Sequence, residues 1–250
     1  SWAGACWAQA GLPTPPFIAL SAAMPEEEVT ASVERCIRTY GDQLVVKPIG
    51  GTEGKGVVLT SGIVETMHAV HDALHSGEVL VSRECGNVRY LTANGPVRCT
   101  VRLNVCWDGG RAIAESGYAQ VAGDPGGVAS AGCGGRVIAL QELWQKLCRI
   151  DETTICPTVD DWCKSVTTAE NGVTALATEL GSTMPALVGV DLLLDADDGG
   201  TIQAILLEAN GRPAGMGHSR FITPDGPTDE PGVTMHLWQR IRITQKSIEQ

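Results

Sequence analysis

The stretch ALVGVDLLLDADDGGTIQAILLEAN, residues 186 to 210, decides the architecture of the C-terminal half of this protein. Its two apolar runs, 186–194 and 202–208, flank a polar segment rich in aspartate and glycine. That pattern predicts two antiparallel β-strands joined by a tight turn. If the hairpin turns through Gly199 and Gly200, both of which tolerate positive φ, Asp191 lies directly opposite Glu208.

Oxygen-bearing side chains interrupt these apolar strands on one predicted face. Asn210 follows Glu208 by two residues and therefore shares its face, and its cross-strand neighbour is Gly189, which has no side chain. Two carboxylates and an amide oxygen around an open space suit Mg²⁺, which takes its remaining ligands from water and substrate phosphates. The sequence therefore predicts a metal site formed by Asp191, Glu208 and Asn210. The alternative for either acid alone is a solvated polar residue at a strand end.

Composition excludes several classes of function. The 250 residues, 43% of them hydrophobic, suffice for one large or two small globular domains. A net charge of −11 argues against a nucleic-acid partner bound by a broad cationic face. No apolar run reaches the roughly 18 to 20 residues of a membrane span, the first ten residues do not resemble a signal peptide, and the nine cysteines contain no C-x-x-C spacing. We expect a cytoplasmic protein with no membrane or nucleic-acid partner.

A glycine-rich loop stands out in the N-terminal half. LVVKP (44–48) and GVVLT (56–60) are predicted strands, and the segment IGGTEGK joins them. The spacing matches neither a Walker A loop nor a G-x-G-x-x-G fingerprint. Backbone N–H groups of such a flap can close over phosphates, and Lys47 can place a point charge there. A loose hairpin without a ligand is the alternative.

Helical stripes and an alternating segment complete the outline. Apolar residues at helical spacing predict helices from Pro25 to Tyr40 and from Ile63 to Leu74, and the strand at 78–83 closes a small α+β unit near residue 84. Further helices are predicted around 141–149 and 165–180. Residues 97–106 alternate between apolar and polar, so the face carrying Arg98, Thr100, Arg102 and Asn104 must meet water or a ligand.

The ordered set LVVKPIGGTEGKGVVL, EVLVSRE, TVRLNV, VGVDLLLD and LLEANGRPAGMGHS resembles the ATP-grasp superfamily, and the last motif is similar to that of D-alanine-D-alanine ligases. The resemblance covers nearly the whole chain. It implies an α+β fold of two subdomains, residues 1–84 with the flap and residues 85–250 with the metal-binding strands, and a nucleotide between them.

The resemblance also implies an activity and a set of site residues. Family members transfer the γ-phosphoryl group of ATP to a carboxylate, which gives ADP and an acyl-phosphate. An amine or a thiol then attacks the acyl-phosphate and displaces phosphate. The substrates would be small-molecule carboxylates and amines, namely an amino acid, a peptide or a related small metabolite, with ATP and Mg²⁺ as cofactors. Arg102 and Arg212 would stabilise the transferred charge, and His218 and Ser219 would contact substrate. The implied nucleotide contacts are Lys47, Gly51, Thr52, Gly54 and Gly56 of the flap, with Val81, Ser82, Arg83 and Glu84 beside the adenine and ribose.

The sequence departs from the family pattern at several positions. Family members carry an N-terminal substrate domain and a second phosphate-contacting lysine, which we expect to lie outside this sequence or on a partner chain. D-alanine-D-alanine ligases place an arginine where Gly189 stands, which disfavours that activity and leaves Arg212 as a substitute. Ser82 and Arg83 replace an acidic pair, so the ribose contact stays open. The alternatives are a nucleotide-binding module without independent catalysis and a carboxylating or purine-pathway enzyme.

A histidine-rich helix face is a weaker candidate. His68, His71 and His75 follow one another at helical spacing and could bind a transition metal. No cysteine or acid follows at a fitting spacing, so an exposed helix face is the favoured interpretation.

Overall fold

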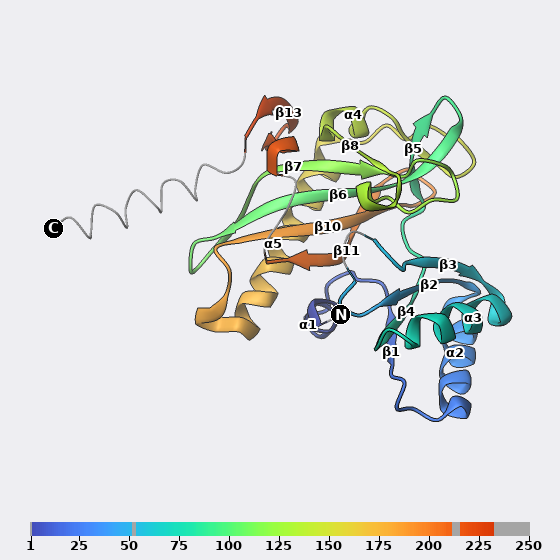
Figure 1. Cartoon of the computed structure of the whole chain (residues 1–250). Helices are drawn as coiled ribbons and strands as arrows, with labels where there is room; N and C mark the ends of the chain where they lie inside the picture. The colour runs from blue at the N-terminus through green and yellow to red at the C-terminus, as the bar shows by residue number, and fades with distance from the viewer. Residues whose placement is uncertain (1, 52–53, 212–215, 233–250) are drawn as a thin grey trace. The chain divides into compact units, whose positions relative to one another are not determined.

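We describe a computed structural model of the chain, over residues 2–51, 54–211 and 216–232. Two compact units are present (Figure 1). One spans Pro15–Cys85, and the other combines Trp2–Thr14 with the chain from Gly86 onward. Each unit has its own hydrophobic core.

The first unit is an antiparallel sheet covered by two helices. Within the described residues the sheet has four strands in the order β1-β4-β2-β3, so β3 is an edge strand. Its core joins Val29, Val33 and Cys36 of the first helix to Leu44 and Val81 of the strands, which confirms the predicted helical stripe. The elements are β1 (Phe17–Leu20), α2 (Glu26–Tyr40), β2 (Gln43–Pro48), β3 (Val58–Ser61), α3 (Gly62–Leu74) and β4 (Val79–Arg83).

The second unit is built on a larger sheet, which helix α5 (Val159–Leu180) covers on one face (Figure 1). The main strand order of this sheet is β11-β10-β6-β7-β12-β13. Three shorter strands lie off this path: β5 pairs with β6, β8 pairs with β7, and β9 pairs with β5. No helix in the described ranges is both long and apolar enough to cross a membrane. The other elements are α1 (Trp2–Gln9), β5 (Val88–Thr92), β6 (Gly95–Trp107), β7 (Ala112–Val121), β8 (Arg136–Ile138), α4 (Leu140–Trp144), β9 (Leu147–Arg149), β10 (Leu187–Ala196), β11 (Ile202–Asn210), β12 (Arg220–Thr223) and β13 (Gly226–Pro231), with short 3₁₀ helices at Ala131–Cys133, Gly181–Thr183 and Met216–His218.

Residues 2–14 pack with the second unit, whereas the predicted boundary assigned them to the first. The Trp7 side chain is fully buried, and its indole N–H donates to the carbonyl of Gly172 in α5 at 2.9 Å. The N–H of Leu206 in β11 donates to the Pro13 carbonyl at 2.8 Å. A large aromatic side chain buried against α5 therefore attaches the N-terminal helix to the second core.

Helix α5 begins earlier than its apolar stripe predicts, at Val159 instead of 165, because a capping box starts it. The Thr158 hydroxyl accepts from the N–H of Asp161 at 3.1 Å, and the Asp161 carboxylate accepts from the N–H of Thr158 at 2.9 Å. The same carboxylate accepts from the N–H of Ile202, the first residue of β11, at 2.9 Å. Burial acts to raise the pKa of Asp161, but the hydrogen bonds that its carboxylate accepts outweigh burial and hold that pKa below its ordinary value. They come from the Thr158 hydroxyl, at 2.7 Å, and from the N–H groups of Thr158 and Ile202.

The helix predicted around 141–149 is too long. The structure has α4 only to Trp144, and Leu147–Arg149 form strand β9, which pairs with β5. Apolar periodicity over so short a segment does not distinguish a helix from a buried strand. The pairing partner, about sixty residues earlier in the chain, decides the outcome here.

The predicted pairing of the C-terminal hairpin is confirmed where it concerns the site. Asp191 lies opposite Glu208, and Gly189 lies opposite Asn210. Strands β10 and β11 place Asp191, Glu208 and Asn210 on one face of the sheet. The opposite face carries Val190, Leu192 and Leu206, which are buried in the core beneath α5.

The turn assumed for that prediction is wrong. Five residues, Asp197 to Thr201, connect the strands, and of the two glycines only Gly200 has a positive φ, of 82°. Near this turn Ala196 pairs with Ile202, one residue away from the predicted register. An irregularity between Asp191 and Leu192 leaves Leu207 as an extra residue on β11 and restores the register at the site.

Candidate active site

A row of polar side chains crosses four neighbouring strands of the second unit. Glu208 on β11 faces Asp191 on β10, Asp191 faces Arg102 on β6, and Arg102 faces Tyr118 on β7. Directly opposed residues on one face of a sheet have Cβ atoms about 4.5–5.5 Å apart, so these side chains interact. The sequence predicted the polar faces of β6 and of the hairpin separately, and the tertiary structure makes them one surface.

Arg102 and Asp191 form a buried ion pair at the centre of the row. The guanidinium Nε donates to Asp191 Oδ1, and Nη2 donates to Oδ2 at 2.6 Å, a two-pronged contact. Each residue is only 8% exposed. Burial acts to lower the pKa of Arg102, but the hydrogen bond and charge of Asp191, with contributions from Tyr118 and Glu208, raise that pKa above its ordinary value. Arg102 is therefore a permanent buried cation.

Tyr118 covers the far side of this cation. Its ring centroid lies 5.8 Å from the guanidinium carbon of Arg102, within cation–π range. Burial raises the pKa of the Tyr118 hydroxyl. The hydroxyl therefore stays protonated at neutral pH and can donate a hydrogen bond. Tyr118 was not predicted from the sequence, although its spacing of two residues from Ser116 on β7 indicates that the two share a face.

The three predicted metal ligands lie together, but Asn210 presents its amide nitrogen to Asp191 instead of its oxygen. Asn210 turns its amide nitrogen toward Asp191, with Nδ2 to Oδ2 at 3.3 Å. The side chain of Glu208 is half-buried and forms no hydrogen bond within the described residues. A carboxylate can accept about four hydrogen bonds. The Asp191 carboxylate accepts two from Arg102 and one from Asn210, so it retains one acceptor position.

This donor set fits a magnesium ion that completes its coordination elsewhere. Glu208 and Asp191 would supply hard oxygen ligands, and rotation of the Asn210 amide would supply a third. Within the described residues no cluster of three or more histidine, cysteine, aspartate or glutamate side chains could hold a metal by itself. An incomplete oxygen set is what Mg²⁺ uses when phosphate and water oxygens supply the remainder.

A second polar row lies one step along the same face. Asn104 on β6 is opposed by Gly189 on one side and by Ser116 on the other. Its amide Nδ2 donates to Ser116 Oγ at 3.0 Å and to Ser219 Oγ at 2.8 Å. Ser219 is 1% exposed, whereas His218 beside it is exposed. The sequence therefore indicated Asn104 and Ser219 separately, but it indicated neither Ser116 nor the contacts among the three.

The flap residues belong to the first unit. Lys47 is half-buried near the end of β2, opposite Leu80 of β4. Gly54 and Gly56 have φ values of 73° and 76°, a conformation that side chains with a Cβ rarely adopt, which explains glycine there. Gly51 precedes them with an ordinary φ. Thr52 and Arg212 lie outside the described residues.

The segment predicted to lie beside the nucleotide base forms the end of β4. Val81 is fully buried in the first core, so its side chain packs against apolar neighbours. Ser82 is half-buried, Arg83 is exposed, and the N–H of Glu84 donates to the Gln43 carbonyl at 3.0 Å. Side chains at Ser82, Arg83 and Glu84 thus lie at the surface of the unit, and the ribose contact among them stays a prediction.

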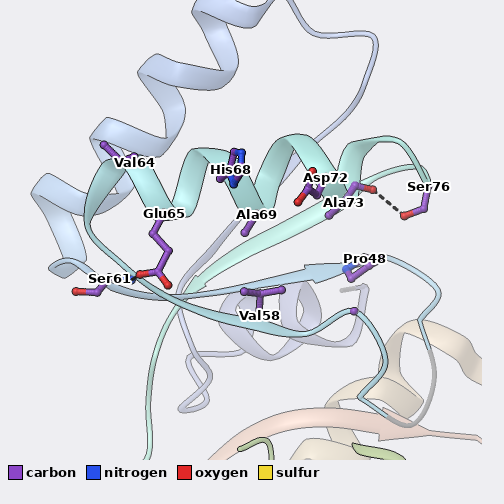
Figure 2. Close-up of a pocket in the computed structure, with 11 residues that line it drawn as sticks. Pro48, Val58, Ser61, Val64, Glu65, His68, Ala69, Asp72, Ala73 and Ser76 are labelled. Atoms are coloured by element: carbon purple, nitrogen blue, oxygen red, sulfur yellow. Dashed lines mark hydrogen bonds between the residues drawn. The ribbon is translucent and has the colours of Figure 1, made fainter. Parts of the chain in front are cut away.

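The first unit also has an open hollow of about 710 Å³ between α3 and the β2–β3 hairpin (Figure 2). Figure 2 shows Glu65 and Ala69 directed from the helix toward Val58 and Pro48 on the strands. Glu65 is already used, because its carboxylate accepts from the N–H of Ser61 at 2.7 Å. The hollow contains none of the predicted nucleotide contacts except Gly56. The candidate site is therefore assigned to the polar face of the larger sheet.

The histidine face of α3 does not form a metal site among the described residues. His68 lines the hollow in Figure 2, and His71 and His75 line a different one near α2. The Nδ1 atom of His75 interacts with the His71 carbonyl oxygen at 2.8 Å, an ordinary contact near a helix end. The arrangement agrees with the favoured interpretation of an exposed helix face.

Comparison with known proteins identifies the architecture. No protein-family model and no curated protein matches the sequence. Solved structures do match: D-cycloserine synthetase DcsG has 16% identity and a TM-score of 0.52, and the match covers 83% of this chain and 60% of that one. VanG D-Ala:D-Ser ligase from Enterococcus faecalis has 14% identity and a TM-score of 0.55, covering 87% and 53%. D-alanine–D-alanine ligase from Bacillus anthracis complexed with ATP has 14% identity and a TM-score of 0.50, covering 86% and 54%.

This chain has the ATP-grasp fold. The predicted α+β class and the predicted resemblance are confirmed at the level of fold. The chain spans 53% to 60% of the length of these three ATP-grasp structures. At 14–16% identity the similarity concerns the fold alone.

Proposed function

We propose that this protein is an ATP- and Mg²⁺-dependent ligase that joins a small carboxylate to an amine or a thiol and releases ADP and phosphate. The row Glu208–Asp191–Arg102, with Asn210 beside it, carries the proposal. It combines oxygen ligands for a cation with a buried guanidinium on one face of a sheet. The fold it lies on is shared with ligases, one of which is complexed with ATP.

The reaction needs positive charge where phosphoryl charge develops. A carboxylate oxygen of the substrate attacks the γ-phosphorus of ATP, and the bond to the β-phosphate oxygen breaks. The amine nitrogen then attacks the acyl carbon, the carbon–oxygen bond to phosphate breaks, and phosphate carries away the displaced proton. When bound, Mg²⁺ would neutralise charge on the phosphate oxygens.

The chain's own residues would supply the rest. Asp191, Glu208 and Asn210 would hold the cation, and Arg102 would stabilise negative charge on the transferred group from a fixed, dry position. Lys47 and the flap glycines Gly51, Gly54 and Gly56 would contact the phosphates through one cation and backbone N–H groups. His218 and Ser219 would contact the substrate.

The test is ADP release by the purified chain over mixtures of carboxylates and amines with ATP and Mg²⁺. Turnover that requires both substrates and falls at least about a hundredfold in Glu208→Gln supports the proposal. Asp198→Asn is the matched control, because it makes the same acid-to-amide change at the exposed turn of the same hairpin. We expect this control to keep full activity.

Binding separates the proposed ligase from the alternative of a nucleotide-binding module. Calorimetric titration with a non-hydrolysable ATP analogue, with and without Mg²⁺, reports the site without turnover. If the nucleotide binds with magnesium dependence but no mixture stimulates ADP release, the module is the correct assignment. If Glu208→Gln leaves the magnesium dependence unchanged, the proposed ligand set is wrong.

A further inference from the structure

The second polar row of the larger sheet contains a buried hydrogen-bond acceptor that the proposed mechanism does not use. Asn104 has no exposed surface and lies between Leu103 and Val105, which belong to the core. Its amide nitrogen is committed to Ser116 and Ser219, at 3.0 and 2.8 Å. Its oxygen, Oδ1, is buried and has no hydrogen-bond partner within the described part of the chain.

An orphaned buried acceptor is uncommon in folded proteins, because most buried polar atoms are paired. Asparagine is also poorly suited to a strand interior, where apolar or β-branched residues pack better. Serine hydroxyls alone do not require an asparagine opposite them, since they can hydrogen-bond to backbone carbonyls. A group from outside the chain that donates to Oδ1 would explain both the residue type and the unused atom.

The geometry indicates where such a donor would lie. The oxygen and nitrogen of an amide diverge by about 120°, and here the nitrogen is directed to Ser116 of β7 and to Ser219. Oδ1 is therefore directed away from both serines. The residue opposite Asn104 on β10 is Gly189, which has no side chain, and Asp191 lies two positions along that strand. The acceptor thus lies next to the row that carries Arg102 and Asp191.

We propose that Asn104 Oδ1 accepts a hydrogen bond from the N–H of the second substrate, and that Asn104 makes the protein select an amine over a thiol. This inference rests on the proposed function and narrows its second substrate. An amine is a strong donor, whereas a thiol is a weak one. A site built to hydrogen-bond an N–H group discriminates strongly against an analogue that lacks it, because the buried acceptor is then left unpaired.

The experiment compares amines and thiols of the same shape. The probes are glycine against mercaptoacetate and alanine against 2-mercaptopropionate, each titrated into the full chain labelled with ¹⁵N. The readout is the side-chain amide signal of Asn104, assigned by its disappearance in Asn104→Leu. We expect amines to move this signal at concentrations about tenfold or more below those needed for the thiols. If neither amine moves it before its thiol analogue does, the proposal is overturned.

Two variants separate ligand recognition from structural support. Asn104→Leu removes the acceptor at similar volume and should reduce the amine-to-thiol affinity ratio, measured by competition calorimetry with the same probes, by about tenfold. Ser116→Ala disrupts the same cluster but retains Oδ1, so we expect it to keep the ratio. Equal ratios in Asn104→Leu and the unmodified protein would refute the inference.

Turnover distinguishes failure of the two proposals. If ADP release requires an amine but the preference over its thiol analogue is unchanged in Asn104→Leu, the ligase assignment stands and the role of Asn104 is wrong. If amines shift the side-chain amide signal of Asn104 while no mixture of substrates releases ADP, the amine site stands and the ligase assignment is wrong.

Discussion

Replacing Asp191 with asparagine should destabilise the second unit far more than an ordinary loss of a salt bridge. Asp191→Asn leaves the Arg102 guanidinium, 8% exposed, without its carboxylate partner. Removing one member of a buried ion pair costs about 3–5 kcal/mol, since the remaining charge stays out of water. Glu208 also interacts electrostatically with Arg102, so we expect the lower end, about 3 kcal/mol.

Urea unfolding followed by tryptophan fluorescence measures this cost selectively. Five tryptophans, at positions 2, 7, 107, 144 and 162, lie among the described residues of the second unit, and none of the six in the sequence falls within Pro15–Cys85. Their emission therefore reports the second unit. With a slope of about 2 kcal/mol per molar urea, a loss of about 3 kcal/mol lowers the midpoint by about 1.5 M. Coincidence of the fluorescence and circular dichroism transitions of that unit checks the two-state assumption.

An exposed pair provides the control. Lys164 and Asp160 approach to 2.6 Å, the length of the Arg102 Nη2 hydrogen bond, but their side chains are 58% and 70% exposed. Asp160→Asn should lower the urea midpoint by at most about 0.5 M, because solvent screens such a pair and a carboxylate near a helix N-terminus contributes at most about 1 kcal/mol. The double replacement of Arg102 by methionine and Asp191 by leucine should recover most of the lost stability. Equal midpoints for Asp191→Asn and Asp160→Asn would refute the claim that burial dominates.

Two further predictions concern stability. Asp161→Ala should cost about 2 kcal/mol in the same urea assay, since it removes a capping box and a buried bond to β11. Because the pKa of Asp161 is lower in the folded protein, the unfolded chain binds the proton of this carboxyl more tightly. The stabilisation of the folded state by ionised Asp161 is therefore complete above the ordinary pKa of 3.8, and it is lost as pH falls through the lower folded-state pKa. The difference between the unmodified protein and Asp161→Asn should therefore shrink in acid, and a constant difference would contradict this. Gly117→Ala should destabilise by about 2 kcal/mol or more, because its Cβ would clash with the Arg102 carbonyl oxygen, whereas Gly110→Ala, with its nearest atom at 3.9 Å, should be neutral.

Much of the local structure could be predicted from short-range pattern. The apolar stripe of α2, the alternation of β6 and the two strands of the C-terminal hairpin are periodic in the sequence, because each buries one face. The flap glycines could be predicted because positive φ favours glycine. The pairing of Asp191 with Glu208 was also predicted, although a longer turn and a bulge at Leu207 produce it.

The sequence by itself thus determined which segments form the strands and which of their faces are polar, since periodicity and glycine placement act over a few residues. Only the tertiary structure decided that β6 lies beside β10, which sets Arg102 against Asp191 across 89 positions of the chain. It also decided that residues 2–14 join the second unit and that Asn104 meets Ser219. Such contacts arise from strand order and from the packing of distant segments around a shared core, and no local pattern encodes a partner so far along the chain.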